Sequence, residues 1–312
     1  MLKLLAEQQG GVFSRQQAIC GGYTAKQVRS RLDDGRWVRI RHGQYAEQQD
    51  LSALEPWVRI RQEHRRMVHA VVNSWRRGAI AVSHQSALAL HGLPLWGLDL
   101  LQVHVTRLDD LTGGTVSGVR HHVGKLAESD LTEVEGLTAT SVARAVFETA
   151  CTTSFEVAVV SLDAALRDRL ISSDDIVRLL DVTEFWPGSA TVRAALGFSD
   201  ARSESVGESR LRVLLHNHGL PAPVLQYEFH DANGFVARVD FYFPEFHTVV
   251  EFDGRAKYGD ASADVLVREK IREDRLRALG LQVVRSDWTD FNRPDLLLAR
   301  IHQAFARSQR AA

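Results

Sequence analysis

The first 46 residues combine apolar positions at helical spacing with a final stretch of alternation. Short helices are predicted over "LKLLAEQQGG" and "SRQQAICGG", because each apolar run ends at glycine. A third is predicted over "TAKQVRSRLDDG"; Ser14 and Thr24 are the expected N-caps, and Val28 faces inward. "RWVRIRHGQYA" then alternates apolar and basic residues around a His42-Gly43 turn, which predicts a β-hairpin. A helix pair followed by a basic helix and a basic hairpin predicts a winged helix.

Residues 47–200 mix helical and strand patterns. A helix is predicted over 55–77, a capped helix over "SHQSALALHG", and two amphipathic helices over "TSVARAVFETACTT" and "FEVAVVSLDAALRDRL". "LQVHVT" and "GVRHHVG" are predicted strands, and the Gly-rich "DDLTGGTVSG" between them is a predicted loop. The small, polar stretch "GFSDARSESVGESR" marks the last domain boundary. We therefore expect three domains, at 1–46, 47–200 and 201–312.

The last domain is predicted as a helix, three strands, a helix, a strand and a helix. "GESRLRVLLHNHG" is the first helix, and "PVLQYEFHDANGFVARVDFYF" is a hairpin because it contains an Asn233-Gly234 turn. The strand "HTVVEFD", the helix "DVLVREKIREDRLRALG", the strand "LQVVR" and the helix "PDLLLARIHQAFARS" complete it. The whole chain is thus predicted to be an α/β (α+β) multidomain protein.

Charge changes this picture more than composition does. The chain is 45% hydrophobic and 25% charged, which is typical of globular proteins. No apolar run approaches the roughly 18 residues of a membrane span, so no membrane association is expected. The net charge is −1, yet residues 1–77 hold 14 Lys and Arg against 7 Asp and Glu, whereas residues 78–200 hold 8 against 16.

The basic N-terminal part predicts a polyanionic partner, although a solvated basic face is the alternative. The predicted third helix and hairpin are expected to contact double-stranded DNA through their basic side chains: Lys26, Arg29, Arg31, Arg36, Arg39 and Arg41. The acidic middle domain suggests a scaffold or a contact with a protein partner.

The spacing of the cysteines and histidines along the sequence does not predict a metal site. Cys20 and Cys151 lie far apart, and we interpret them as reduced thiols in the core of a cytoplasmic protein. Histidines of the middle region fall on a predicted helix and on predicted strands, and we expect them to be structural. They are His84, His91, His104, His121 and His122.

The stretch "RVDFYFPEFHTVVEFDG" places Asp240, Glu251 and Asp253 in strand-forming sequence. A buried carboxylate normally neutralises, pairs or binds a metal. Side chains alternate across strands, so Glu251 and Asp253 share one face, and Asp240 joins them if the strands form a meander. Converging carboxylates favour a cation, and oxygen ligands suit Mg²⁺ or Mn²⁺. The pattern predicts a metal site at these three residues, able to activate water for phosphodiester hydrolysis.

Two regions resemble known families. "GGVFSRQQA" and "GYTAKQVRSRLDDGRWVRIRHGQYA" resemble the winged helix of AbiEi-type antitoxins, and "AVSHQSALALHGLPL" and "LTATSVARAVFETA" are similar to the middle region of an actinobacterial antitoxin-like group. The order acidic helix, "VDFYF", "VVEFDG", "REKIREDRLRALG" and "LQVVRSDW" resembles the very-short-patch-repair-like branch of the PD-(D/E)XK nucleases. That resemblance implies a mixed sheet flanked by helices and metal-dependent DNA cleavage.

By position, the nuclease resemblance assigns Asp240 as the first acid, Glu251 as the second and Glu208 as the acid of the first helix. Gln226 matches a polar position of the preceding strand. Asp253 stands where the superfamily has its lysine.

Several residues of this site remain open to a second interpretation. Lys257 or Lys270 is expected to supply the missing positive charge, although Lys270 can instead pair with Asp274. Ser205 and Glu208 also fit a capping box, which by itself explains Glu208.

Two main functions follow. The first is a DNA-binding endonuclease, dependent on Mg²⁺ or Mn²⁺ and targeted by the winged helix. It would use Glu208, Asp240, Glu251, Asp253 and Lys257. The alternative is a catalytically inactive, antitoxin-like transcriptional regulator that binds DNA through the same winged helix. A protein-interaction module acting through the acidic middle domain is a third hypothesis.

Overall fold

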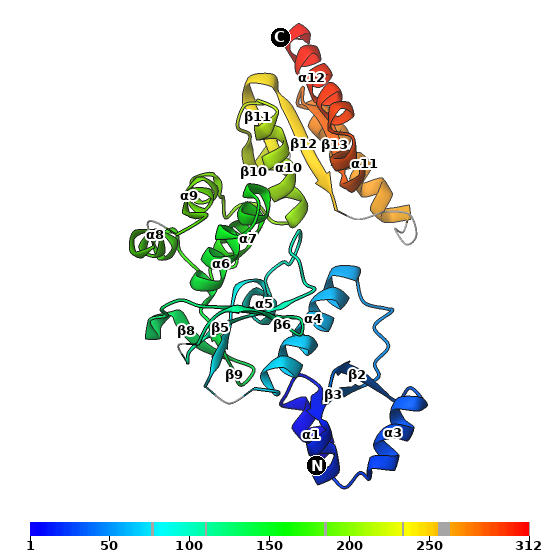
Figure 1. Cartoon of the computed structure of the whole chain (residues 1–312). Coiled ribbons are helices and arrows are strands. Elements are labelled where there is room, and N and C mark those ends of the chain that lie inside the picture. The colour runs from blue at the N-terminus through cyan, green and yellow to red at the C-terminus, as the bar shows by residue number, and fades with distance from the viewer. Residues whose placement is uncertain (76–77, 110, 184–185, 233, 255–262, 312) are drawn as a thin grey trace. The chain divides into compact units, whose positions relative to one another are not determined.

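The computed structural model describes residues 1–75, 78–109, 111–183, 186–232, 234–254 and 263–311 (Figure 1). The chain divides into two units, Met1–Ser199 and Asp200–Ala312. Helices and mixed sheets occur in both units, so the predicted α/β (α+β) class is confirmed. Across the described ranges, no helix has both the length and the apolar character that crossing a membrane requires.

The N-terminal part has the predicted winged-helix layout and one additional strand. Its elements are α1 Leu2–Glu7, β1 Val12–Ser14, α2 Arg15–Cys20, α3 Ala25–Asp33, β2 Trp37–Arg41 and β3 Gln44–Glu47. The β2–β3 hairpin is the wing. Strand β1 pairs antiparallel with β3, which gives the sheet order β1-β3-β2.

An aromatic core holds the winged helix together. Phe13 and Trp37 meet edge to face with ring centroids 4.7 Å apart, and Tyr23 packs on Trp37 at 5.0 Å. Val28 of α3 is buried in this cluster. Aromatic pairs in this geometry are favourable beyond the area that they bury. Because the core holds the apolar side of α3, the opposite side of that helix faces solvent.

Both predicted N-caps of this part are observed. The Ser14 hydroxyl accepts from the Gln17 backbone N–H at 3.1 Å, and the Thr24 hydroxyl accepts from the Gln27 backbone N–H at 3.2 Å. Each glutamine side chain also accepts from the backbone N–H of its N-cap residue, which completes a capping box. These caps set where α2 and α3 begin.

Replacing Thr24 by alanine is expected to destabilise α3 by about 1 kcal/mol, because the side-chain acceptor for an otherwise unpaired N–H is lost. Hydrogen exchange of the α3 amides should then be roughly fivefold faster, as RT ln 5 is about 1 kcal/mol. Thr24→Ser keeps the hydroxyl and is the matched control. Equal protection in wild type and Thr24→Ala would contradict this role of the cap.

The middle of the first unit is a mixed sheet with helices around it. Strands β4 and β9 pair parallel, as do β5 and β7, and the sheet order is β6-β7-β5-β4-β9-β8. The elements are α4 Pro56–Val72, β4 Ile80–Val82, α5 His84–Leu90, β5 Val103–Arg107, β6 Gly114–Val116, β7 Val119–His122, η1 Glu128–Asp130, β8 Leu131–Val134, β9 Leu137–Thr140, α6 Val142–Cys151, α7 Phe155–Arg167, α8 Ser173–Val182 and α9 Ser189–Phe198.

Two short hairpins differ from the sequence expectations. Strand β6 lies within the predicted Gly-rich loop and pairs with β7 around Ser117 and Gly118, both at positive φ. Strands β8 and β9 pair around Glu135 and Gly136, also both at positive φ. Two consecutive left-handed residues form the tight turns that match the strand twist. The strands themselves have only three or four residues, too few for a periodic pattern.

The second unit has the predicted element order. Its elements are α10 Val206–Asn217, β10 Val224–Asp231, β11 Gly234–Phe243, η2 Pro244–Phe246, β12 Thr248–Asp253, α11 Ala263–Ala278, β13 Gln282–Asp287, η3 Trp288–Asn292 and α12 Pro294–Ala311. Strands β10, β11 and β12 form the antiparallel meander that we expected, and β13 joins β12 in parallel. The turn residue Asn233 lies outside the described residues.

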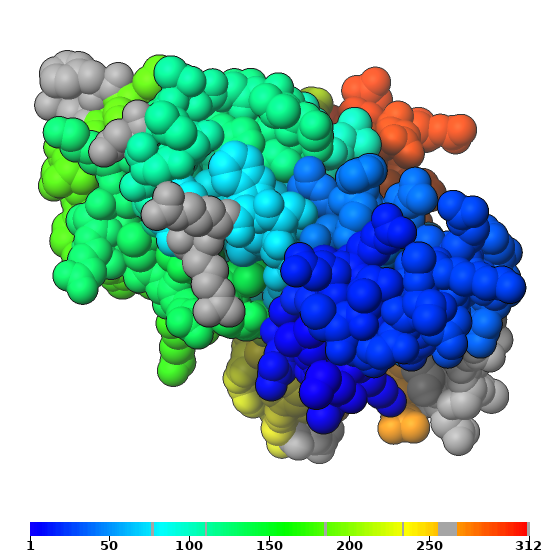
Figure 2. Space-filling view, turned by 60° about the horizontal axis from the view of Figure 1, so that its bottom comes forward, coloured from blue at the N-terminus to red at the C-terminus, as the bar shows by residue number. Residues whose placement is uncertain are grey.

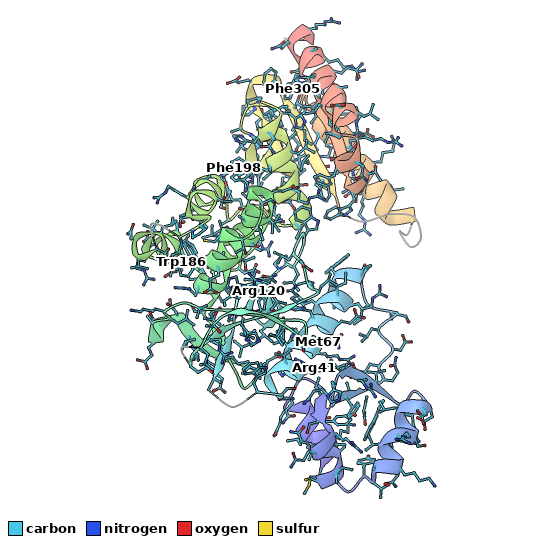
Figure 3. The ribbon with its side chains drawn as sticks, in the orientation of Figure 1. Arg41, Met67, Arg120, Trp186, Phe198 and Phe305 are labelled. Carbon is cyan, nitrogen blue, oxygen red and sulfur yellow. The ribbon has the colours of Figure 1, made fainter. Side chains whose placement is uncertain are left out.

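Helices cover both faces of this sheet. On one face, Leu211 of α10 and Ile301 of α12 pack on Phe241. Phe305 of α12, marked in Figure 3, stacks on Phe246 with ring centroids 3.9 Å apart. On the other face, Leu276 of α11 is buried against β11 and β12. Side chains near the ends of β11 and β12 can therefore contact helices on either face of the sheet.

Candidate functional site

Three cations stand on the solvent side of the winged helix. Lys26 and Arg29 are exposed on α3, and Arg39 is exposed on the wing. Side chains of this blue N-terminal part project from the face that Figure 2 turns to the viewer. The three cations lie on α3 and on the wing, the two elements that a winged helix presents to the major groove and to the phosphate backbone. The described contacts thus leave a basic surface of Lys26, Arg29 and Arg39.

Of the other three predicted DNA-binding residues, two have local contacts and the third is half-buried. The Arg31 guanidinium lies over the Tyr23 ring at 5.0 Å, which is a cation–π contact within the core of the domain. Arg36 Nε donates to the Asp34 carboxylate at 2.9 Å. Arg41 is half-buried, and burial lowers the pKa of its guanidinium. These arginines support the α3–wing junction as well as adding charge to it.

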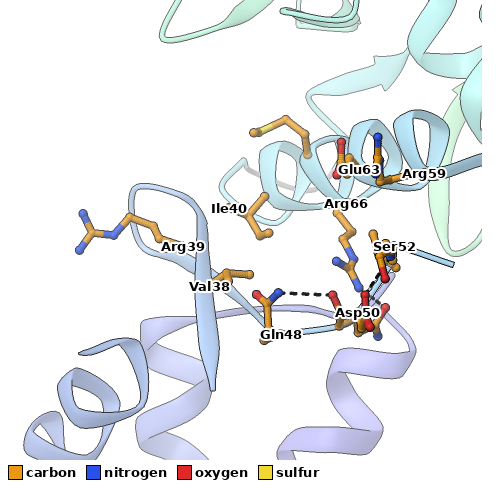
Figure 4. Close-up of a pocket in the computed structure, with 12 residues that line it drawn as sticks. Val38, Arg39, Ile40, Gln48, Asp50, Ser52, Arg59, Glu63 and Arg66 are labelled. Carbon is orange, nitrogen blue, oxygen red and sulfur yellow. Dashed lines mark hydrogen bonds between the residues drawn. The ribbon is translucent and has the colours of Figure 1, made fainter. Parts of the chain in front are cut away.

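A cavity of about 590 Å³ lies between the wing and helix α4 (Figure 4). Its lining contains the cations Arg39, Arg59 and Arg66 and the acids Asp50 and Glu63. The Arg66 guanidinium donates to the Gln49 side chain. Because both signs of charge line this cavity, its chemistry does not single out an anionic ligand.

In the second unit, one amide links two of the predicted carboxylates. Gln226 Nε2 donates to Glu208 Oε2 at 3.1 Å and lies 3.4 Å from Asp240 Oδ1. Asp240 Oδ2 also accepts from the Phe252 backbone N–H at 2.8 Å. Gln226 has a φ of 52°, a conformation that costs a non-glycine residue about 1–3 kcal/mol and is enriched at functional sites.

Burial, more than the neighbouring carboxylates, changes the acidity of this pair. Burial, with the neighbouring Glu208 carboxylate next in importance, raises the pKa of Asp240 to about 7. Burial also raises the pKa of Glu208. Asp240 is therefore partly protonated near neutral pH, which is one of the ways in which a buried carboxyl avoids an uncompensated charge.

Glu208 contacts both the N-cap residue of α10 and the Gln226 amide. The Ser205 hydroxyl accepts from the Glu208 backbone N–H at 3.1 Å and donates to Glu208 Oε1 at 2.8 Å. The second carboxylate oxygen, Oε2, accepts from the Glu204 backbone N–H and from Gln226. The Ser205 hydroxyl therefore caps α10 and is itself held by Oε1, while Oε2 joins the Glu204 backbone to the Gln226 amide.

Glu251 is neutralised by arginines. Arg272 of α11 donates to Glu251 Oε1 at 2.7 Å and to Oε2 at 2.9 Å, a bidentate pair. Arg285 of β13 lies 3.7 Å from Glu251 Oε2. Sequence reasoning missed Arg272, because the arginine-rich α11 sequence does not indicate which guanidinium turns toward the sheet.

The remaining predicted site residues are less informative. Asp253 is half-buried at the end of β12, on the same strand face as Glu251. Lys270 is exposed on α11. Lys257 lies outside the described residues. The geometry places Glu208, Gln226 and Asp240 together and directs Glu251 toward arginines.

The sequence also missed a convergence in the first unit. His84, His104 and His122 each offer a ring nitrogen, and these nitrogens all lie within 4.8 Å of one another. Among the described residues, this is the one group of three or more His, Cys, Asp or Glu side chains whose ligand atoms lie this close together. Their positions on a helix and on two separate strands give no spacing signal.

Comparisons with known proteins identify the N-terminal part. Residues 1–48 match the family described as "Transcriptional regulator, AbiEi antitoxin". Uncharacterized proteins from two strains of Mycobacterium tuberculosis are each 34% identical to this chain over 182 residues, which are 58% of the chain. The match spans 66% of the length of each relative, just under two thirds. The expected AbiEi-type character of the N-terminal domain is thus confirmed for residues 1–48.

Proposed function

We propose that this protein is a transcriptional regulator of the AbiEi antitoxin type, which binds duplex DNA through α3 and the β2–β3 wing. The observation that carries the proposal is the basic surface of Lys26, Arg29 and Arg39 on a domain that matches this family. In a winged helix, side chains of the third helix read base edges, while wing cations contact phosphates. Arg29 is suited to a bidentate contact with guanine, because its guanidinium is planar and exposed.

A binding-site selection from random duplexes, followed by footprinting of the selected site, tests this function. We expect a sequence-selective footprint whose affinity does not change when Mg²⁺ is replaced by EDTA. Uniform coverage of all duplexes at low salt, without a selected site, would reject a regulator and leave only non-specific DNA binding.

A second candidate function is metal-dependent phosphodiester hydrolysis in the second unit, favoured by the Glu208–Gln226–Asp240 cluster. Mg²⁺ and Mn²⁺ prefer oxygen ligands. Glu208 and Asp240 provide carboxylate oxygens that lie close together, because both contact the side-chain amide of Gln226. A cation also fits the charges of this cluster, since the neighbouring Glu208 contributes to the raised pKa of Asp240. We expect Glu208 and Asp240 to hold the ion; Glu251 can join them only by leaving Arg272.

When bound, a divalent cation supplies Lewis-acid polarisation of the phosphodiester. Asp240 and Glu208 would hold the ion as carboxylates, because a bound cation favours the charged form of each group. Gln226 holds the Glu208 and Asp240 carboxylates in place through its amide. Arg272 is placed to supply positive charge beside Glu251.

A plasmid assay separates the two candidates. Wild type, Asp240→Ala and the exposed-site control Glu228→Gln are incubated with Mg²⁺, Mn²⁺ or EDTA, and nicked and linear forms are scored. Cleavage that needs metal, persists in Glu228→Gln and disappears in Asp240→Ala would support hydrolysis at this cluster. Absence of cleavage on plasmid, single-stranded and mismatched substrates would leave the regulator alone.

A further inference from the structure

Three histidines meet on one side of the middle sheet of the first unit, and neither site described above includes them. His84 begins α5, His104 lies on β5 and His122 lies on β7. The His84 and His122 rings stack with centroids 3.7 Å apart, and His104 Nδ1 lies 2.9 Å from His122 Nε2. Helix α5 and two parallel strands thus bring the three imidazoles into direct contact.

The hydrogen bonds define which ring nitrogens carry protons. The side-chain amide nitrogen of Gln85, Nε2, donates to the Asp99 backbone carbonyl at 3.1 Å and to His104 Nε2 at 2.9 Å. His104 Nε2 is therefore an acceptor, and the ring proton sits on Nδ1, from which it is donated to His122 Nε2. The His104–His122 contact consequently holds a proton at the point between the two rings where a cation would sit.

A carboxylate stands behind the third ring. His84 Nδ1 lies 3.4 Å from Glu148 Oε2, and Glu148 is fully buried and paired with Arg144 at 2.8 Å. Histidines that bind metals usually donate their second ring N–H to a carboxylate or a carbonyl, which orients the ring and raises its basicity. His84 Nδ1 also lies 3.1 Å from Ser83 Oγ. Because Ser83 and Glu148 both face Nδ1, the other ring nitrogen of His84, Nε2, is left for a metal.

Backbone strain occurs at the same position. His84 has a φ of 52°, in the left-handed region that a non-glycine residue with a Cβ rarely adopts, and its side chain is buried. Such a conformation costs about 1–3 kcal/mol and persists where surrounding contacts require it. Here it turns the His84 ring onto His122 at the first residue of α5.

We propose that His84, His104 and His122 form a zinc site, with the ion bound by His84 Nε2, His104 Nδ1 and His122 Nε2. Imidazole nitrogens suit Zn²⁺, and sites with three protein ligands keep a fourth position for water or another small ligand. This site does not depend on the proposed DNA-binding function or on the carboxylates of the second unit. It ties α5 to β5 and β7.

To bind the ion, the three rings must rearrange: ligand nitrogens that now lie within 4.8 Å of one another must reach tetrahedral spacing, and the stacked His84 ring must turn so that its nitrogen lone pair points at the ion. With Zn–N distances of about 2.0–2.1 Å and tetrahedral angles, two ligand nitrogens lie roughly 3.3–3.4 Å apart. His104 Nδ1 and His122 Nε2, now 2.9 Å apart, must therefore separate by about half an ångström as the proton between them is replaced. The three rings are neutral at pH 7, because burial lowers the pKa of His104 and of His122 to about 4 and that of His84 well below its usual value.

Gln85 can follow the change in His104. Binding at Nδ1 moves the ring proton of His104 to Nε2, which then needs an acceptor. Among the described residues, the buried Gln85 Oε1 has no hydrogen-bond partner, and rotation of the amide presents it to His104 Nε2. A cavity of about 430 Å³, lined by Gln85, His104 and Arg120, gives the ion a route from solvent. Arg120, marked in Figure 3, lies on β7 next to this cavity.

Zinc titration of the full-length chain tests the proposal. Protein stripped with a chelator is titrated with Zn²⁺ at pH 7.5 against a chromophoric competitor. We expect one equivalent to bind with sub-micromolar affinity, and His104→Gln and His122→Gln each to weaken binding at least 100-fold. His302→Gln, at an exposed position, is the matched control and should bind as wild type does.

The controls separate this site from the carboxylate cluster. Asp240→Asn should leave Zn²⁺ affinity unchanged, whereas loss of binding in that variant would place the ion in the second unit and overturn the proposal. Stoichiometric binding that survives in both histidine variants, or no binding below 10 µM in wild type, would overturn it as well.

If neither histidine variant folds, the X-ray absorption spectrum of the zinc-loaded wild type decides. A first shell with the multiple-scattering pattern of three imidazoles supports the site. A shell dominated by carboxylate oxygen, or one containing sulfur, rejects it.

Discussion

Replacing Asp240 by asparagine is expected to stabilise the second unit at pH 8, although it removes a site residue. The folded-state pKa of Asp240 is raised from 3.8 to about 7, mainly by burial and then by Glu208. With a raised folded pKa, the stability contribution of the protonated carboxyl is complete below about pH 4 and is lost as the pH rises through 7. Asparagine resembles the protonated acid and does not incur this loss.

The expected size follows from about 1.4 kcal/mol per unit of pKa shift, which gives a ceiling of about 4 kcal/mol. Asp240 is only partly buried, and solvent screening brings the expected gain to roughly 2 kcal/mol. The gain should shrink steadily from pH 8 toward pH 4. A buried carboxylate that lowers the stability of its domain, as Asp240 is expected to do, is typical of functional sites.

Urea unfolding followed by hydrogen-exchange mass spectrometry can measure this gain, because peptides from residues 200–312 report the second unit separately. Glu228→Gln removes an exposed carboxylate from the same sheet and should show no such pH dependence. A gain for Asp240→Asn that is equal at pH 5 and pH 8 would refute the ionisation argument. At pH 8, Mn²⁺ that stabilises wild type but not Asp240→Asn would support the second candidate function.

The double replacement of Arg29 and Arg39 by alanine is expected to weaken binding of duplex DNA by one to two orders of magnitude at about 0.1 M salt. Each phosphate contact contributes about 0.9 to the slope of log affinity against log salt, so two lost contacts reduce the slope by about 1.8. Arg29 lies on α3 and Arg39 on the wing, so the pair samples both elements of the proposed interface.

The matched control removes the same charge elsewhere in the first unit. Lys125 and Arg193 are exposed in the middle domain, and their double replacement by alanine should leave the salt slope unchanged. If both double variants weaken binding equally, net charge rather than the winged helix drives association. An unchanged slope after loss of Arg29 and Arg39 would remove the winged helix from the interface.

Local signals in the chain were sufficient for much of the fold. The N-caps at Ser14 and Thr24, the inward Val28 and the alternation of the wing predicted the winged helix, because caps and periodicity depend on neighbours three or four residues away. Element order also placed Asp240 in the meander of the second unit. The β8–β9 hairpin escaped prediction, because its strands are short and its turn at Glu135 uses a left-handed non-glycine residue.

Contacts between distant segments were decided only when the chain folded. The pairing of Glu251 with Arg272 depends on how α11 packs on the sheet, and no spacing within α11 distinguishes Arg272 from its neighbouring arginines. The meeting of His84, His104 and His122 depends on the parallel register of β5 and β7 and on the turn into α5. Residue identity determines which chemistry is available and which local structure forms. Which of those groups share a low-dielectric site, and hence their pKa values and ligands, is set by packing over long sequence separation.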